Sequence, residues 1–181
     1  MRAELVELLG ESPCRQVALR RHWRVVEEQV GRELPADYRW FVEEYGDALI
    51  AGFLYVPHPA SHSDLARSGA LPEFIESHSE NWQGALPFLP RGLPERVEAV
   101  RDEVIPWADH TYNGDSCLLL PPAPGWPKWG IAILFRQCPD VAVFEGGVVE
   151  FIHRILIQGV WPRGWPTGQT PWLPCDDDDV E

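Results

Sequence analysis

The chain has 181 residues and a formal net charge of −13, from 28 acidic and 15 basic side chains. A chain of this length buries roughly 70% of its unfolded surface on folding, so it needs neither disulfides nor a metal to build a core. The acidic balance disfavours direct binding to nucleic acids or anionic membranes, because lysine and arginine are needed to bind phosphates. It suits the capture of a basic protein, although a role in solubility alone would also explain it.

The sequence indicates a cytoplasmic protein. It contains no run of about 18 apolar residues, so no membrane span is predicted. The N-terminal stretch MRAELVELLGE carries acids among its apolar residues and has no small-residue cleavage site, which is unlike a signal peptide. The four cysteines form no CxxC pair, and we expect free thiols, with Cys117 and Cys138 buried in apolar strands. A structural disulfide is the less favoured alternative.

Two helices are predicted in the first 31 residues. Residues 1–9 form a short helix that Gly10 ends. Ser12 followed by Pro13 resembles an N-cap with a first-turn proline, and Gly31 ends the helix that follows. The apolar residues of this second helix recur at helical spacing and are Leu19, Trp23, Val26 and Val30.

A third helix, within residues 31–47, has the clearest boundaries in the sequence. Pro35 suits its first position and Gly46 its stop. Asp37 lies in the first turn, where its charge interacts favourably with the helix dipole. The apolar residues at i, i+3, i+4 and i+7 are Tyr38, Phe41, Val42 and Tyr45. We expect this face to lie in the core.

Downstream, short strands follow one another before a last helix. Asn113-Gly114 is a strong hairpin signal, and Gly146-Gly147 turns the chain into the last helix. The predicted strands are 48–57, 104–107, 117–120, 129–136 and 141–144, and the predicted helices are 71–83 and 148–158. Residues 84–94 and 121–128 are proline-rich loops. The fold class is therefore α+β, with N-terminal helices packed on a mostly antiparallel sheet, a C-terminal helix and an extended Trp/Pro-rich tail.

The stretch 160–174 holds Trp161, Trp165 and Trp172 together with four prolines, so it cannot be a regular helix or a central strand. We expect an extended arm whose rings pack on the core. The alternative is an aromatic contact surface, because tryptophan is enriched at binding hot spots. Residues 1–175 form a single domain with a core of about 12–159 and an arm of 160–175, and residues 176–181 form an acidic disordered tail.

Several segments match, in order, the pattern of a known family. The first group is Val30-Gly31, Leu34-Pro35, Tyr38, Phe41 and Tyr45-Gly46. The second group is 105–107 with 113–120, and the third is 141–147 with 151–159. Across roughly residues 23–159 the chain resembles the SMI1/KNR4 family of the SUKH superfamily. The long proline-rich segment after the first strand and the Trp-Pro tail depart from that pattern.

The resemblance implies an α+β domain without established catalysis. Bacterial members of the family are mostly immunity proteins, which neutralise toxins, often nucleases or nucleic-acid deaminases, by binding the toxin domain. Fungal relatives regulate the synthesis of cell-wall glucan. Family membership does not fix a partner.

Three groups of residues raise the question of chemistry. His58, His62 and Asp64 have close spacing that suits a metal, but Pro59 disfavours a helix presenting both histidines on one face. Acids surround the Asn-Gly hairpin next to His110, yet no nucleophile motif or phosphate loop accompanies them. The run 176–179 could hold a cation weakly, although a solvated tail is the favoured interpretation.

We therefore expect a non-enzymatic, protein-binding domain, without cofactor or metal, that acts as an immunity protein in the cytoplasm. Its partner would be a basic toxin domain of the nuclease or deaminase class. The candidate partner-binding residues are Asp102, Glu103, Asp109, Asp115, Trp126 and Trp165. In this hypothesis the acids steer the partner and exposed tryptophans supply affinity. A regulatory or scaffold module of the same fold, with no toxin partner, is the alternative.

Overall fold

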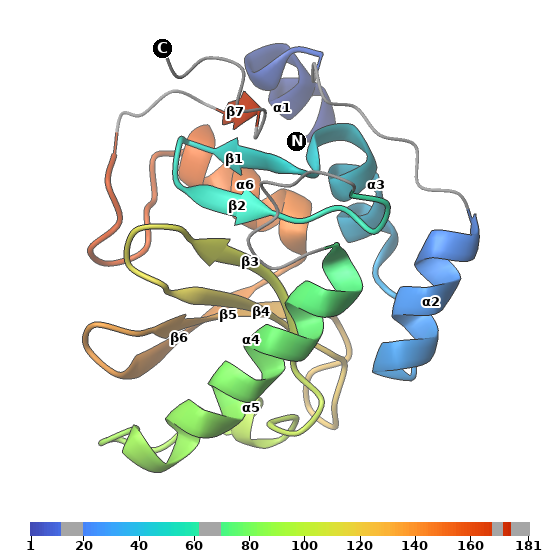
Figure 1. Ribbon diagram of the computed structural model, residues 1–181. Helices are drawn as coiled ribbons and strands as arrows, with labels where there is room; N and C mark the ends of the chain where they lie inside the picture. Colours follow the sequence, from blue (N-terminus) through green and yellow to red (C-terminus); the bar gives the residue numbers. More distant parts are fainter. Residues whose placement is uncertain (12–19, 62–69, 168–171, 175–181) are drawn as a thin grey trace.

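The computed structural model describes residues 1–11, 20–61, 70–167 and 172–174 (Figure 1). Within them a seven-stranded antiparallel sheet has the order β6-β5-β4-β3-β2-β1-β7. The strands are β1 (Ala48–Ile50), β2 (Leu54–Val56), β3 (Ile105–His110), β4 (Ser116–Leu120), β5 (Gly130–Phe135), β6 (Asp140–Glu145) and β7 (Trp172–Pro174). The helices are α1 (Arg2–Leu9), α2 (Arg20–Val30), α3 (Ala36–Tyr45), α4 (Leu71–Ala85), α5 (Glu95–Glu98) and α6 (Val148–Leu156), with the 3-10 turn η1 (Leu86–Phe88). The predicted α+β class is confirmed.

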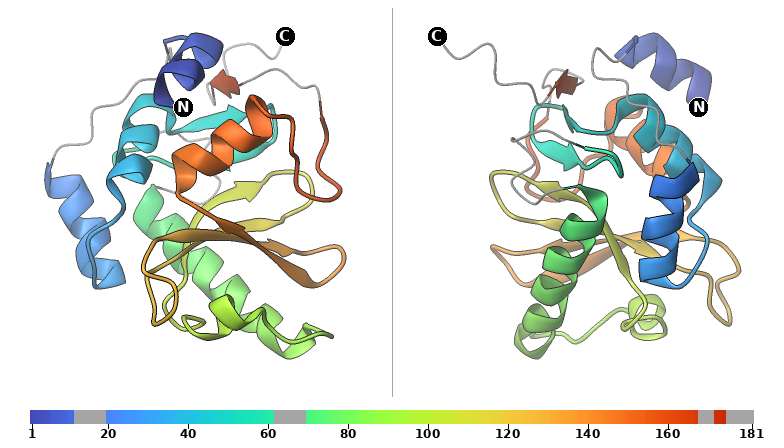
Figure 2. Two further views of the ribbon diagram at one scale, coloured as in Figure 1. Left: turned by 180° about the vertical axis from the view of Figure 1, so that it is seen from behind. Right: turned by 45° about the vertical axis from the view of Figure 1, so that its right-hand side comes forward.

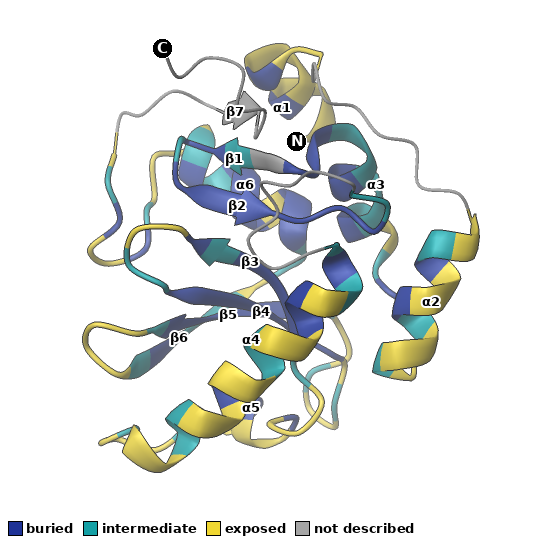
Figure 3. Ribbon diagram, in the orientation of Figure 1, coloured by how far each residue is buried: buried dark blue, intermediate teal, exposed yellow. Residues whose placement is uncertain are grey.

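Helices cover both faces of the sheet. α4 crosses one face, and α6 lies on the other beside α3 (Figure 2). Alternating side chains of the central strands accordingly enter two clusters, because successive side chains of a strand point to opposite faces. Leu118 and Leu120 pack with Trp82 of α4, whereas Cys117 and Leu119 belong to the larger cluster that includes α6. The central strands are largely buried, and α2 and α4 each have a buried and an exposed side (Figure 3).

The third predicted helix is confirmed as α3, and all four of its apolar residues are buried. Pro35 is the N-cap residue and not the first helical residue, one position earlier than expected. Gly46 ends the helix in an extended conformation, with φ −69° and ψ 159°. A Cβ at Gly46 would overlap the Val42 carbonyl and lie 3.2 Å from the ring of His58. Glycine is therefore required after the end of α3 because of close packing, and not because of a positive φ.

The predicted strand 48–57 is wrong, because the chain forms a hairpin there. β1 and β2 pair with Ile50 opposite Leu54. Between them Ala51 and Gly52 adopt positive φ angles of 54° and 76°, which reverse the chain. Two consecutive positive φ angles are typical of tight hairpin turns, but alanine at the first of them gives no sequence signal.

The remaining strands follow the prediction closely. The Asn113-Gly114 hairpin joins β3 to β4, and the Gly114 φ of 72° supplies the left-handed turn residue. α4 extends two residues beyond the predicted helix, and the expected loop 84–94 contains η1. Cys117 is buried as expected, whereas Cys138 is exposed, because β5 ends before it and it lies in the turn to β6. Cys14 and Cys175 lie outside the described residues.

The arm after α6 returns to the sheet. Trp165 is buried and Trp161 packs against the core, as the extended-arm interpretation predicted. β7 then pairs with β1, with Ile50 opposite Trp172, so it lies at an edge of the sheet and not in its centre. The predicted acidic tail, 176–181, lies outside the described residues. Among the helices that the structure describes, none combines the length and apolar character that a membrane crossing requires.

Candidate binding groove

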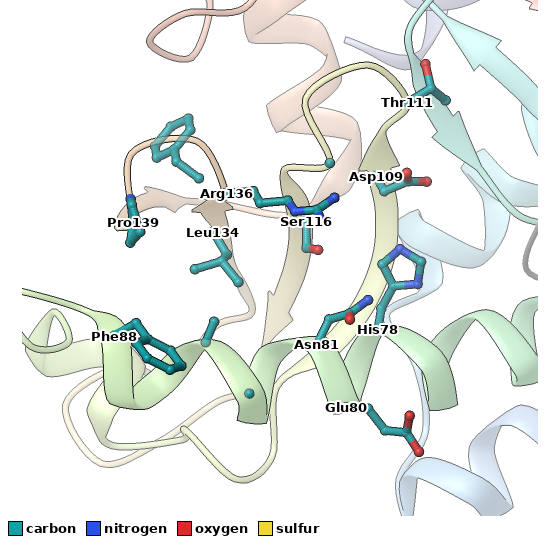
Figure 4. A pocket seen from close by; sticks show the side chains of 14 residues that line it. His78, Glu80, Asn81, Phe88, Asp109, Thr111, Ser116, Leu134, Arg136 and Pro139 are labelled. Atoms are coloured by element: carbon teal, nitrogen blue, oxygen red, sulfur yellow. The ribbon is translucent and has the colours of Figure 1, made fainter.

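A groove of about 660 Å³ separates α4 from the ends of the β3–β4 and β5–β6 hairpins (Figure 4). We call it the α4 groove. Its helical wall consists of His78, Glu80, Asn81, Gly84, Ala85 and Phe88, and its sheet wall of Asp109, Thr111, Gly114, Ser116, Leu134, Phe135, Arg136 and Pro139. Its volume lies in the usual range of ligand pockets.

The floor of the groove is a row of side chains across three strands. Asp109 on β3 is directly opposite Ser116 on β4, which is directly opposite Leu134 on β5. Directly opposed residues share a face of the sheet, so all three point toward α4. The half-buried Asp109 and the buried Ser116 give this end of the floor its polar character.

The helical wall above this floor carries His78. The His78 ring stacks on Phe74 with 3.8 Å between ring centroids, and its Nδ1 lies 3.1 Å from the Phe74 carbonyl oxygen. Burial lowers the pKa of His78, so the ring is neutral at pH 7. A neutral ring that donates from Nδ1 to the Phe74 carbonyl leaves Nε2 as a hydrogen-bond acceptor. Figure 4 shows His78 rising from α4 toward Asp109.

The other end of the α4 groove is apolar. Phe88 is 74% exposed on its rim, and Leu134 and Pro139 face it from the hairpin side. Gly84 lies in the helical wall, and a Cβ built there would meet nothing within 4 Å. The groove therefore grades from polar side chains near Asp109 to apolar side chains near Phe88.

The predicted partner-binding residues divide between different places. Asp109 lines the α4 groove. Asp115 is 3% exposed, and its carboxylate accepts hydrogen bonds from the Arg136 backbone N–H at 2.9 Å and from Trp165 Nε1 at 3.0 Å. Trp165 is 5% exposed. The expectation of an exposed Trp165 is therefore wrong. The hydrogen bond between Trp165 and Asp115 holds the arm that follows α6 against the sheet.

Asp102 and Glu103 lie at the opposite end of β3 from Asp109. Both are exposed, and they form ion pairs with Arg101 and Arg32, respectively. A strand of six residues spans about 20 Å, so these two acids do not join the hairpin acids in one site. Trp126 is half-buried in the loop between β4 and β5, where the Arg96 guanidinium lies 5.9 Å from its ring centroid.

In two of the three groups considered for chemistry, a buried histidine is explained by packing. His110 is buried, and its Nδ1 accepts hydrogen bonds from the backbone N–H groups of Tyr112 and Asn113 at 3.3 and 3.2 Å. His58 is buried with Nδ1 accepting from the Ala60 N–H at 3.1 Å, while His62 and Asp64 lie outside the described residues. Across the described ranges no group of three His, Cys, Asp or Glu side chains could hold a metal ion.

Sequence reasoning missed the helical wall of the groove. His78 falls within the predicted helix 71–83, whereas Gly84 falls within the predicted proline-rich loop 84–94. The structure keeps Gly84 inside α4. One signal in the sequence was available. Gly84 follows Asn81 by three residues, so within a helix the two lie on the same face, and no turn is needed at this glycine.

Comparisons of the chain with protein-family models, with curated proteins and with solved structures find no match. The α4 groove combines polar and apolar side chains, which is typical of sites that bind peptides or small ligands.

Proposed function

We propose that this protein is a non-enzymatic, SMI1/KNR4-type binding domain that acts as a cytoplasmic immunity protein. It binds a toxin domain directly and blocks access of the toxin's substrate. The toxin domain is basic and belongs to the nuclease or deaminase class. No cofactor, metal, nucleic acid or membrane takes part in this proposal.

The observation that carries the proposal is one aromatic cluster, in which residues of three separate motif segments meet. The ring centroids of Tyr38 and Trp107 are 6.0 Å apart, and those of Trp107 and Phe151 are 6.2 Å apart, both edge to face. Each motif alone is weak, but the three segments that carry the motifs are in contact in the core. Their contact supports the interpretation of the ordered motifs as one family pattern.

A second contact joins the same segments. Asp37, in the first turn of α3, accepts a hydrogen bond from the backbone N–H of Val149, in the first turn of α6, at 3.3 Å. Gly147, the N-cap residue of α6, has no side chain to fill this capping role. The first motif helix thus supplies the cap of the last one, which is further support for one structural unit.

The charge of the chain favours a basic partner. Enzymes that act on nucleic acids need basic surfaces to bind phosphates. An acidic protein is attracted to such a surface, and its field speeds the encounter. Asp109 places part of this negative charge in the α4 groove.

Co-expression tests the proposal most directly. The neighbouring gene is expected to encode a large secreted protein with a basic C-terminal domain. Expressing that C-terminal domain alone should arrest the cells, and co-expressing this chain should restore growth and yield a complex that co-purifies. Failure of both rescue and co-purification would contradict the proposal and favour the regulatory or scaffold alternative.

Charge substitutions test the steering part of the proposal. The variant D102N/E103Q/D109N should associate more slowly with the toxin domain at low salt, and its association rate should depend less on salt. Asp115 is left unchanged because it is buried. The variant E7Q/E73Q/E95Q removes three exposed acids outside the groove and serves as the control. Equal association rates for the two variants would contradict steering by the first three acids.

A further inference from the structure

We infer that the free edge of β6 binds an extended segment of the protein partner, which pairs with β6 as a further strand of the sheet. The inference rests on the proposed function in one respect, that the partner is a protein bound directly. The evidence is the unpaired backbone of β6, the regularity of this strand and the apolar side chains on both of its faces.

One edge of β6 has no partner among the described residues. β6 is the last strand of the sheet on its side and pairs with β5. The Val141 N–H donates to the Asp140 carboxylate at 2.9 Å, so it points away from β5. Because successive residues of a strand direct their backbone groups to opposite edges, those of Val143 and Glu145 also point outward. No turn or loop of the described residues forms a hydrogen bond with the backbone of Val143.

This edge of β6 faces solvent. Buried backbone groups are almost always paired, so the unpaired N–H and C=O groups of Val143 indicate an open edge. Burial agrees with this conclusion, because Ala142, Val143 and Phe144 are half-buried whereas every residue of the central strand β4 is buried. Figure 2 shows β6 at the side of the sheet that is remote from the β1–β2 hairpin.

β6 lacks most of the features that protect edge strands. Its six residues pair with β5 without a register shift, and the strand contains no proline and no lysine. Natural edge strands commonly carry bulges, prolines or charges that prevent pairing with other molecules. In β6 the four central residues are apolar, and the charged residues Asp140 and Glu145 stand at the two ends. A regular edge of this kind is a template for an added strand.

Apolar side chains on both faces of β6 would contact the added strand. Val141 and Val143 belong to the cluster on the α4 side of the sheet, and Leu93 packs against the same cluster. On the other face Phe144 packs on Phe151 of α6, with 5.2 Å between ring centroids. An added strand extends both faces, so β-branched side chains suit it on each of them.

The geometry of the edge selects the occupant. Alternating N–H and C=O groups along a strand match an extended backbone, whereas the backbone groups of a helix are used within the helix. A second copy of the chain also carries a net charge of −13, which opposes its approach. An extended segment of another protein is therefore the occupant that the edge and the charge favour.

Peptide titration of the full, isotope-labelled chain tests the inference by NMR. The probe is the acetylated and amidated peptide Lys-Thr-Val-Thr-Val-Thr-Lys. The control is the same peptide with two adjacent backbone nitrogens methylated, which blocks both of its edges. The probe should shift the amide signals of Val143 and Glu145, and the control should bind roughly tenfold more weakly, because backbone hydrogen bonds supply the affinity. Equal binding of the two peptides, or shifts confined to other surfaces, would overturn the inference.

Two substitutions at one position separate backbone pairing from side-chain contact. Val143→Pro removes the outward N–H without removing a hydrogen bond between β5 and β6, and proline is tolerated on edge strands in this orientation. Val143→Ala shortens the same side chain and keeps the N–H. Val143→Pro should bind the probe roughly tenfold more weakly than Val143→Ala does, and urea denaturation checks that both variants are folded. Equal affinities of the folded variants would overturn the inference, and the methylated peptide tests the same hydrogen bonds on the unchanged chain.

Sedimentation velocity decides between a partner protein and a second copy at this edge. The full chain should sediment as a monomer at the concentrations used for the titration. A dimer that Val143→Pro abolishes and Val143→Ala preserves would overturn the choice of occupant.

These results are independent of the test of the proposed function. Pairing of the probe with β6, together with failure to rescue cells from the toxin domain, would contradict the immunity function but not the site. Rescue that is as strong with Val143→Pro as with Val143→Ala would contradict the β6 edge as the partner's docking place but not the immunity function.

Discussion

His110 lies in the interior, against three aromatic rings. Its ring is stacked on Phe53 with 4.4 Å between centroids, and those of Trp165 and Tyr112 contact it edge-on at 5.4 and 6.1 Å. Its Nδ1 accepts two backbone hydrogen bonds in the β3–β4 turn, which fixes the ring as a neutral acceptor. Burial lowers the pKa of His110, and the nearby Asp115 carboxylate opposes this shift only in part. His110 is thus a structural residue of the hairpin.

The lowered pKa of His110 makes stability depend on pH. Because the pKa of His110 is lower in the native state than the ordinary histidine value of 6.5, the unfolded state binds the proton more readily. The stability contribution of the neutral ring is therefore present above pH 6.5 and is lost as the pH falls below it. We expect the free energy of unfolding, measured by urea denaturation, to fall between pH 7.5 and 5.5.

The variant His110→Asn is the control for this prediction, because the amide oxygen can accept hydrogen bonds as Nδ1 does but does not titrate. Its free energy of unfolding should fall less over the same pH range. His78 has a lowered pKa as well and remains in both proteins, so the comparison isolates His110. Identical pH profiles for the two proteins would contradict the assignment.

At the scale of elements, the contact between α3 and α6 joins the two ends of the domain. Asp37 supplies a carboxylate to the N-terminus of α6, where backbone N–H groups lack partners within the helix. The carboxylate approaches so closely that a Cβ at Gly147 would overlap it. The Gly147 backbone itself is extended, with φ −86° and ψ −175°, which any residue can adopt. Glycine is needed at residue 147 only because the Asp37 carboxylate lies too close for a Cβ.

Gly147→Ala should therefore destabilise the fold by about 1 kcal/mol, through displacement of the capping Asp37 carboxylate and not through backbone strain. Chemical denaturation of the single variants Gly147→Ala and Asp37→Ala and of the double variant measures the coupling between the positions. Once Asp37 has become alanine, the added methyl group has space, so the double variant should be more stable than the sum of the two losses predicts. Strictly additive losses would contradict the proposed overlap.

At the scale of the whole molecule, periodicity and turn signals predicted the layers of the fold. Tyr38 and Phe41 mark a buried helix face, and Asn113-Gly114 marks a hairpin, because these patterns depend only on local geometry. The turn at Ala51 was missed because only the surrounding structure holds alanine at a positive φ. The burial of Trp165 was foreseen only in the extended-arm interpretation, since its partner Asp115 is 50 residues away in the sequence.

The groove was beyond sequence reasoning for a related reason. It exists because α4 crosses the sheet at the hairpin ends, and this crossing brings His78 over Asp109. Neither residue belongs to a sequence motif that would predict its proximity to the other. Of the six candidate residues, only Asp109 lines this groove. The positions of charged residues in the sequence therefore do not predict which of them lie together on the surface.

The C-terminal strand protects one edge of the sheet. β7 pairs with all three residues of β1, which would otherwise present unpaired backbone groups to solvent. Open edges of this kind promote pairing between molecules.

Ending the chain at residue 167 should therefore expose the β1 edge, and the sedimentation coefficient of this truncated chain should rise with protein concentration. Ending it at residue 174 removes the acidic tail but keeps β7, so this control should show a weaker rise, and equal behaviour of the two chains would show that lost charge, and not the open edge, drives association.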